Sequence, residues 1–429
     1  MCRRTYPRNA ADNARVPQMF HAASSPGSKR TPLPALRPPA PEAPRPQRPD
    51  TRRGPSDEQR DPFFDNAKYL AIVLVGLGHA WANIMSDNRL LQTAYTVVYV
   101  FHMPAFIIIS GYFSRTFDLR PHRLKRLLTG VLVPYLVFQT AYSLFRIHVG
   151  HTGDPHINLF VPWYLTWFLC ALFVWRLTAP VWRMLRRPLP VALAVAMLAS
   201  VTPGMGGLLD MQRILQFAPC FVLGMCLKPE HFHLVRRRAA RIASVPVFVL
   251  TVAAAWWATP GLQISWLYRN AAAQDLGAPW WAGPVTVLVL FACAVLLTAC
   301  FLAWVPGRRL WCTALGAGTL GGYLLHGFVV RGVLYAGGFE PDWMHGPLGA
   351  LVVTVVAAAG VTLLCTPAVL RVFRWVMEPR MDWAFRPVAP RTAGESGGTD
   401  GRAAVSGQAG TAETAGAETS EKAGAATGR

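Results

Sequence analysis

Charged residues are scarce in this chain. Only 15% of its 429 residues are Asp, Glu, Lys or Arg, whereas 52% are hydrophobic. A soluble protein needs a more polar surface, so this composition favours a protein whose helices lie in lipid. The net charge of +20 comes from the two terminal regions and from short loops between apolar runs. No basic stripe or motif of a nucleic-acid-binding fold is present, and we expect no nucleic-acid partner.

Paired cysteines are also missing. None of the eight cysteines forms a Cys-x-x-Cys pair. Seven of them lie within apolar runs: Cys170, Cys220, Cys226, Cys293, Cys300, Cys312 and Cys365. This pattern predicts small packing residues rather than a disulfide framework or a zinc site, and we expect no metal.

The two ends of the chain have too few apolar residues to form a core. Residues 1–60 are rich in Pro and Arg and lack the layout of a secretory signal, and residues 388–429 are mostly Ala, Gly, Thr, Ser and Glu. Both segments are predicted to be disordered cytoplasmic tails. Residues 61–387 are predicted to form one transmembrane domain.

Long apolar runs in this domain predict an all-α, polytopic membrane helix bundle. A helix needs about 20 mostly apolar residues to cross the roughly 30 Å hydrocarbon core of a bilayer. About ten runs meet or approach this length, of which the fifth is short: 66–85, 92–113, 126–148, 160–182, 189–203, 211–228, 241–259, 282–304, 311–336 and 347–372.

Lys and Arg alternate between loops in a way that predicts the orientation of the bundle. The loops after the second, fourth, sixth and eighth spans contain fifteen such residues: Arg115, Arg120, Arg123, Lys125, Arg126, Arg183, Arg186, Arg187, Lys228, Arg236, Arg237, Arg238, Arg241, Arg308 and Arg309. The other loops contain only Arg89 and Arg269. Because cytoplasmic loops retain positive charge, both termini are predicted to be cytoplasmic, in a multi-pass protein of the plasma membrane.

Three histidines lie well inside predicted spans, away from the span ends, where an ionisable group costs about 2.5–3.5 kcal/mol on insertion scales. By their positions, His79, His102 and His326 fall in the middle to outer half of the bilayer and are predicted to converge on one cavity. We treat them as candidate catalytic residues. For His102 an alternative stays open, because Pro104 frees a helical carbonyl that this histidine could satisfy.

Lys68 and His79 are spaced to share one helix face. Eleven steps of about 100° end only about 20° from alignment, and the two residues lie about 16 Å apart along the axis. This spacing suits a substrate whose charge is held by Lys68 and whose reactive end reaches His79. The alternative is that Lys68 snorkels to the surface and His79 is a hydrogen-bonded packing residue.

Other basic residues are candidates for binding anions. Arg123 and Arg126, beside Lys125, precede a predicted span and suit phosphate groups, although positive loops also follow from topology alone. Arg213 and Arg331 lie toward the outer side and are weaker candidates for meeting an anionic or hydroxylated acceptor. A group of aromatic residues near the outer face suits a membrane belt or sugar stacking: Trp163, Tyr164 and Trp167.

Five motifs in register resemble the acyltransferase-3 family, and its fucose 4-O-acetylase-like branch in particular. The resemblance covers about residues 60–385, and the motifs occur in this order: DNAKYLAIVLVGLGH (65–79), FHMPAFIIISGYF (101–113), PWYLTWFLCALFVWRL (162–177), QFAPCFVLG (216–224) and TLGGYLLHG (319–327). Ser110 and Gly111 in the second motif are predicted to allow close helix approach.

The resemblance implies transfer of an acyl group, usually acetyl from cytoplasmic acetyl-CoA, to a hydroxyl of a carbohydrate or glycolipid. The family's basic residue and essential histidine then correspond to Lys68 and His79, with Lys in place of the more usual Arg. Its Arg-x-x-Arg loop corresponds to Arg123 and Arg126, and its late histidine to His326. We expect His79 to act as a general base or as the carrier in an acyl-histidine relay.

A transporter or flippase is the main alternative function, because buried histidines and a lysine also serve proton-coupled carriers. Carriers often have paired halves with matching broken helices, and the sequence contains no such internal repeat. The acyltransferase interpretation is therefore favoured.

Overall fold

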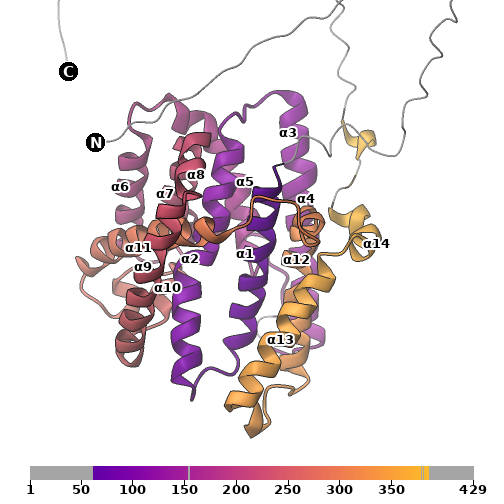
Figure 1. Cartoon of the computed structure of the whole chain (residues 1–429). Helices are drawn as coiled ribbons and strands as arrows, with labels where there is room; N and C mark the ends of the chain where they lie inside the picture. The colour runs from indigo at the N-terminus through magenta and orange to yellow at the C-terminus, as the bar shows by residue number, and fades with distance from the viewer. Residues whose placement is uncertain (1–60, 153–154, 378, 380, 386–429) are drawn as a thin grey trace, which may run out of the picture. The chain divides into compact units, whose positions relative to one another are not determined.

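The structure is a computed structural model, and it describes residues 61–152, 155–377, 379 and 381–385. Every regular element in the described part of the chain is a helix, as predicted. The longer helices are α1 (Pro62–Trp81), α2 (Arg89–Ser114), α4 (Val133–His148), α5 (Trp167–Met184), α6 (Pro188–Ser200), α7 (Met211–Cys226), α9 (Arg238–Ala258), α11 (Ala282–Trp304), α12 (Thr319–Tyr335), α13 (Pro347–Leu364) and α14 (Pro367–Met377) (Figure 1). Shorter helices are α3 (Pro121–Leu127), α8 (Pro229–Val235) and α10 (Ser265–Tyr268).

Six of the described helical segments are long and apolar enough to cross a membrane by length and composition. They are Arg89–Ser114, Pro121–His148, Arg238–Gly261, Ala282–Trp304, Thr313–Tyr335 and Pro347–Leu364. The remaining predicted spans correspond to α1, α5, α6 and α7, which are shorter or less apolar. With 13 residues, α6 is only about 20 Å long. The count of ten spans therefore stays a prediction.

The last predicted span, 347–372, is wrong as a single helix. The structure ends α13 at Leu364 and begins α14 at Pro367. Proline has no backbone N–H and is favoured in the first turn of a helix, so Pro367 starts a new helix rather than continuing the old one. The predicted tails, 1–60 and 388–429, lie outside the described residues.

Helices α1 and α2 lie side by side in the middle of the described bundle (Figure 1). On one side, α2 packs against α7, α9 and α11; on the other, α1 packs against α12 and α13. Because both central helices are covered by neighbours, polar side chains on their inner faces are held away from lipid. Thus His79 on α1 and His102 on α2 are available to a shared internal site.

Helices α2 and α7 pack with almost no space between their backbones. A Cβ atom added to Gly111 would collide with the backbone carbonyl of Phe221, and one added to Gly224 would collide with that of Ile108. The predicted close approach at Gly111 is confirmed. Small residues at such positions allow backbones to meet by van der Waals packing, which is the main source of helix association in lipid.

The first helix is anchored at both ends. Asp61 caps it by accepting a hydrogen bond from the Phe63 N–H at 2.9 Å. Within the helix, Asn66 donates to the Pro306 and Arg308 carbonyls, and it is fully buried. After the last turn, Asn83 donates to the His79 carbonyl at 2.8 Å. These contacts fix both the rotation of α1 and the position of its histidine.

Candidate active site

A cavity of about 350 Å³ lies among α1, α2, α7 and α12. Its walls also include residues of two connecting segments, 164–167 and 267–270. It contains His79 and His102, two arginines and five tyrosines, but no described carboxylate lines it. A concave site of this size with convergent polar groups is typical of small-ligand binding.

His79 lies between an aromatic side chain of the cavity and a second histidine. Its ring centroid is 4.9 Å from that of Tyr164 in an edge-on arrangement, and 5.5 Å from that of His326. The predicted convergence on one cavity is found for His79 and His102, which both line it. His326 contacts the His79 ring but lines a separate, apolar cavity. Their catalytic roles stay predictions.

His102 and His326 have the same internal hydrogen bond. The Nδ1 atom of His102 lies 2.8 Å from the Val98 carbonyl, and that of His326 lies 2.9 Å from the Gly322 carbonyl, each one helical turn back. A carbonyl can only accept, so the proton is on Nδ1 and the neutral ring keeps an acceptor lone pair at Nε2. In His326 this Nε2 is buried without a hydrogen-bond partner.

His102 does not satisfy the carbonyl that Pro104 frees, which was the alternative role for this histidine. Pro104 frees the carbonyl four residues before it, at Val100. The ring of His102 bonds Val98 instead and packs edge-on against Tyr99 at 4.7 Å. His102 is therefore oriented toward the cavity by its own helix rather than recruited by the proline.

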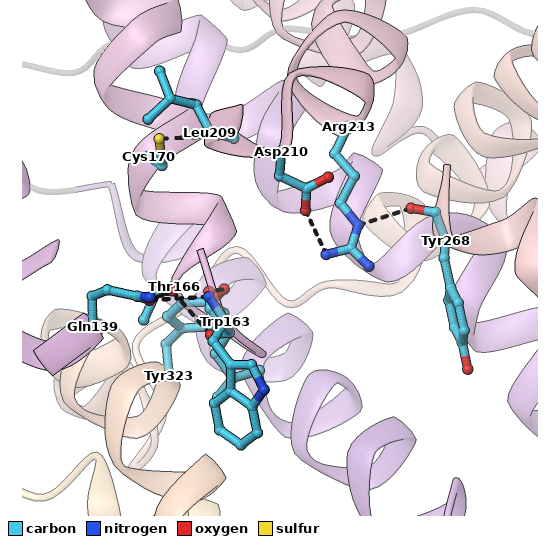
Figure 2. Close-up of polar contacts among 10 residues, drawn as sticks. Gln139, Trp163, Thr166, Cys170, Leu209, Asp210, Arg213, Tyr268 and Tyr323 are labelled. Atoms are coloured by element: carbon cyan, nitrogen blue, oxygen red, sulfur yellow. Dashed lines mark hydrogen bonds and ion pairs between the residues drawn. The ribbon is translucent and has the colours of Figure 1, made fainter. Parts of the chain in front are cut away.

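Arg213 is held in the cavity wall by two contacts (Figure 2). Its Nη1 atom lies 2.8 Å from an Asp210 carboxylate oxygen, and its Nε atom donates to the Tyr268 carbonyl at 3.1 Å. Burial raises the pKa of the Asp210 carboxyl, and the Arg213 guanidinium opposes this shift. The pair joins α7 to segment 267–270, which covers the cavity.

Arg331 has a different environment. Its guanidinium lies 4.5 Å from the ring centre of Tyr164 and 5.2 Å from that of Trp163, within the range of cation–π attraction. Its Nε atom is buried without a hydrogen-bond partner. No carboxylate of the described residues pairs with it.

Segment 158–166, which carries Tyr164, is fixed by one buried glutamine of α4 (Figure 2). The amide nitrogen of Gln139 donates to the Asn158 and Val161 carbonyls, at 2.9 and 2.8 Å. Its oxygen accepts from the Trp163 N–H at 3.0 Å and from the Thr166 hydroxyl at 2.5 Å. All four polar positions of the amide are thus used to shape the segment.

Left-handed backbone conformations occur around the cavity. Tyr164, Asp210 and Arg269 have φ values of 58°, 53° and 53°. A non-glycine residue in this region costs of order 1–3 kcal/mol and persists only when its surroundings impose it. Tyr164 lines the cavity, Arg269 follows the cavity residue Tyr268, and Asp210 pairs with the cavity residue Arg213. The strained conformations therefore help to shape the site.

The basic residues predicted to bind the acyl donor lie elsewhere. The Lys68 ammonium is 2.7 Å from Asp65 and 5.9 Å from the ring centre of Phe113, at the far end of α2. Arg123 pairs with Asp118 at 3.5 Å, and Arg126 is exposed. Phe113 is eleven residues beyond His102 on α2, roughly 16 Å along its axis. The structure therefore separates these cations from the histidine cavity.

Several wall residues were not predicted as part of the site. Tyr95 and Tyr268 join α2 to segment 267–270 through a 3.1 Å contact between their hydroxyls. Asp210 and Gln139 were also missed, although a buried Asp or Gln beside apolar residues is a signal that the sequence contains. Arg213 and Arg331 were predicted as weak candidates, and both line the cavity.

Similarity to known proteins identifies the family of this chain. No solved structure matches the chain. Nodulation protein NolL of Sinorhizobium fredii is 41% identical over 58 residues, which are 13% of this chain and 16% of that protein. The chain thus spans about a sixth of the length of this curated relative. The model of the acyltransferase-3 family, described as an acyltransferase domain, matches residues 61–368, so the chain belongs to that family.

Proposed function

We propose that this protein is an integral membrane O-acyltransferase of the plasma membrane. It transfers an acyl group, acetyl being the expected one, from cytoplasmic acyl-CoA to a hydroxyl of a cell-surface or membrane-linked carbohydrate. The observation that carries the proposal is the contact of His79 with both His326 and a cavity lined by tyrosines and arginines. Aromatic faces and polar groups together suit a sugar.

The basic segment before α4 fits the phosphates of the donor. Residues 115–126 contain five Lys and Arg residues against one acid, Asp118. Arg123 and Arg126 would hold phosphate oxygens, because guanidinium groups bind them bidentately. Lys68 would contribute from α1. When bound, acyl-CoA supplies the acyl group as an activated thioester.

His79 would be the general base. It accepts the proton of the acceptor hydroxyl as the oxygen forms its bond to the acyl carbon, and it returns that proton to the leaving sulfur. The products are an ester and free CoA thiol. His326 packs against His79, and its buried Nε2 has no hydrogen-bond partner.

Labelled acetyl-CoA tests the proposal. Membranes containing the wild-type chain are expected to place label in glycan or glycolipid, and His79→Ala is expected to lose about 10²–10⁴-fold of the rate. His233→Ala is the matched control, because that histidine is exposed on α8. Equal incorporation by wild type and His79→Ala would contradict the proposal. Uptake or efflux of a glycan without incorporation would instead support a transporter or flippase.

A further inference from the structure

The charges around the cavity do not balance. Arg213 and Arg331 line it, and Arg269 lies behind it, 5% exposed, with its guanidinium over the Phe217 ring. Of the described carboxylates, only Asp210 pairs with any of these three arginines. Three buried or half-buried cations therefore have one anionic partner.

Such an excess is costly unless a ligand compensates for it. Buried charges in proteins are normally paired, and a charge inside a membrane protein usually marks a substrate pathway. Arg213 is satisfied by Asp210 and the Tyr268 carbonyl. Arg269 and Arg331 both lack a carboxylate. Arg269 donates to the Gln216 carbonyl at 3.3 Å, whereas the Nε hydrogen of Arg331 is buried and has no acceptor. The missing partner is therefore an anion or strong acceptor at Arg331.

The position of Arg331 relates this anion to the reacting centre. Tyr164 contacts both groups, with its ring 4.9 Å from the His79 ring and 4.5 Å from the Arg331 guanidinium. Arg331 is also five residues beyond His326 on α12, roughly 7.5 Å along the axis. A group bound at Arg331 is thus one aromatic ring away from the base.

We infer that the acceptor is an acidic sugar whose anionic group binds Arg331 while a neighbouring hydroxyl reaches His79, a conclusion that rests on the proposed function for the identity of His79 as base. A carboxylate matches the planar fork of a guanidinium bidentately, and the cavity wall beside it contains the aromatic rings of Tyr164 and Trp167. A phosphate on a sugar has the same pair of oxygens. A binding experiment with one sugar of each kind distinguishes a carboxylate from a phosphate.

Ligand-induced thermal stabilisation of the purified full-length protein tests the inference without requiring catalysis. The probes are methyl glucuronoside, glucose 1-phosphate, methyl glucoside and coenzyme A. Wild type is expected to bind one of the two anionic sugars at least about tenfold more tightly than methyl glucoside. Which of the two binds identifies carboxylate or phosphate as the recognised group.

Variants assign the effect to Arg331. Arg331→Gln is expected to remove the preference, Arg331→Lys to keep part of it, and Arg89→Gln to keep all of it. Arg89 is a matched control because it also lies over a tryptophan, Trp256, but outside the cavity. Arg331→Lys keeps the positive charge. A preference that follows this charge, complete in Arg89→Gln, partial in Arg331→Lys and absent in Arg331→Gln, therefore differs from the result of a folding defect in Arg331→Gln alone.

Three results would overturn the inference: equal binding of neutral and anionic sugars, an unchanged preference in Arg331→Gln, or loss of coenzyme A binding rather than sugar binding in that variant. The last would assign Arg331 to the donor. An acidic-sugar preference without transfer of labelled acetyl would contradict the proposed function and leave the binding site standing.

Discussion

The two ends of α1 differ in how their charged groups are compensated. At the first end, Lys68 is 28% exposed and pairs with Asp65, and nearby Arg123 pairs with Asp118. At the other end, His79 faces a cavity whose described lining contains arginines and no carboxylate. The first end carries partly exposed cations that pair with acids, and the other carries two cavity arginines, of which only Arg213 has a carboxylate partner.

This difference indicates two kinds of binding. An exposed pair contributes only about 0–1 kcal/mol, so a phosphate can replace the acid at little cost. A buried arginine without an acidic partner has no existing ion pair to replace. Binding of an anionic ligand to it therefore contributes more free energy. We expect variants at the first end to change the KM for the donor, and variants at the second end to change chemistry and acceptor choice.

The largest expected effect is at His79. His79→Gln removes the base but keeps a polar side chain of similar size, so kcat should fall about 10²–10⁴-fold while the KM for acyl-CoA changes little. Steady-state kinetics on the purified protein would measure both constants. A rise in the KM for acyl-CoA with unchanged kcat would contradict the assignment of donor binding to the Lys68 end of α1 and of chemistry to the His79 end.

Gln139→Leu should have the next largest effect. It leaves the Trp163 N–H and the Asn158 and Val161 carbonyls without their partner, which should lower stability by about 1–3 kcal/mol and displace Tyr164. The melting temperature and the KM for the acceptor report the change. Thr140→Val is the control, since that hydroxyl bonds Leu136 on its own helix. A change in donor KM alone would contradict the expectation.

The double variant Arg123→Gln/Arg126→Gln should raise the KM for acyl-CoA about tenfold and leave kcat within about twofold, because it removes phosphate contacts far from the reacting atoms. Arg186→Gln/Arg187→Gln is the matched control, as these exposed arginines belong to another predicted cytoplasmic loop. Initial rates over a range of acyl-CoA concentrations give the KM and kcat of both double variants. An equal effect in both pairs would show that only general positive charge matters.

Lys68→Gln should have the smallest effect, an increase of about two- to fivefold in the KM for acyl-CoA, because Lys68 is half-exposed and already paired with Asp65. Lys68→Arg should restore the wild-type value. If Lys68→Gln instead abolished transfer as completely as His79→Gln, the lysine would belong to the catalytic end of the helix despite its distance from the cavity.

The histidines of the site could be predicted from the sequence, whereas the connecting segments that shape it could not. A histidine in an apolar span is conspicuous because lipid gives it no partner. The left-handed conformations of Tyr164, Asp210 and Arg269 have no such signal, since none of them is glycine. Their conformations depend on contacts made by distant residues, of which Gln139 is the clearest case.

The positions of the helices could also be predicted from the sequence, but their exact ends could not. Apolar runs indicated where helices lie, but run length alone did not detect the break at Pro367 or the late start of α5 at Trp167. The assignment to the fucose 4-O-acetylase-like branch and the cytoplasmic position of the termini stay predictions.

The glycine contact between α2 and α7 has a consequence for movement of the cavity wall. Gly111 and Gly224 leave no room for a side chain between the two backbones, so we expect these helices to move together and to keep His102 and Arg213 at a fixed separation. We therefore expect substrates to enter and leave past other parts of the wall, such as α1 and α12. His79 lies on α1 and Arg331 on α12, so a movement of one helix against the other would change the distance between the proposed base and the proposed anion site.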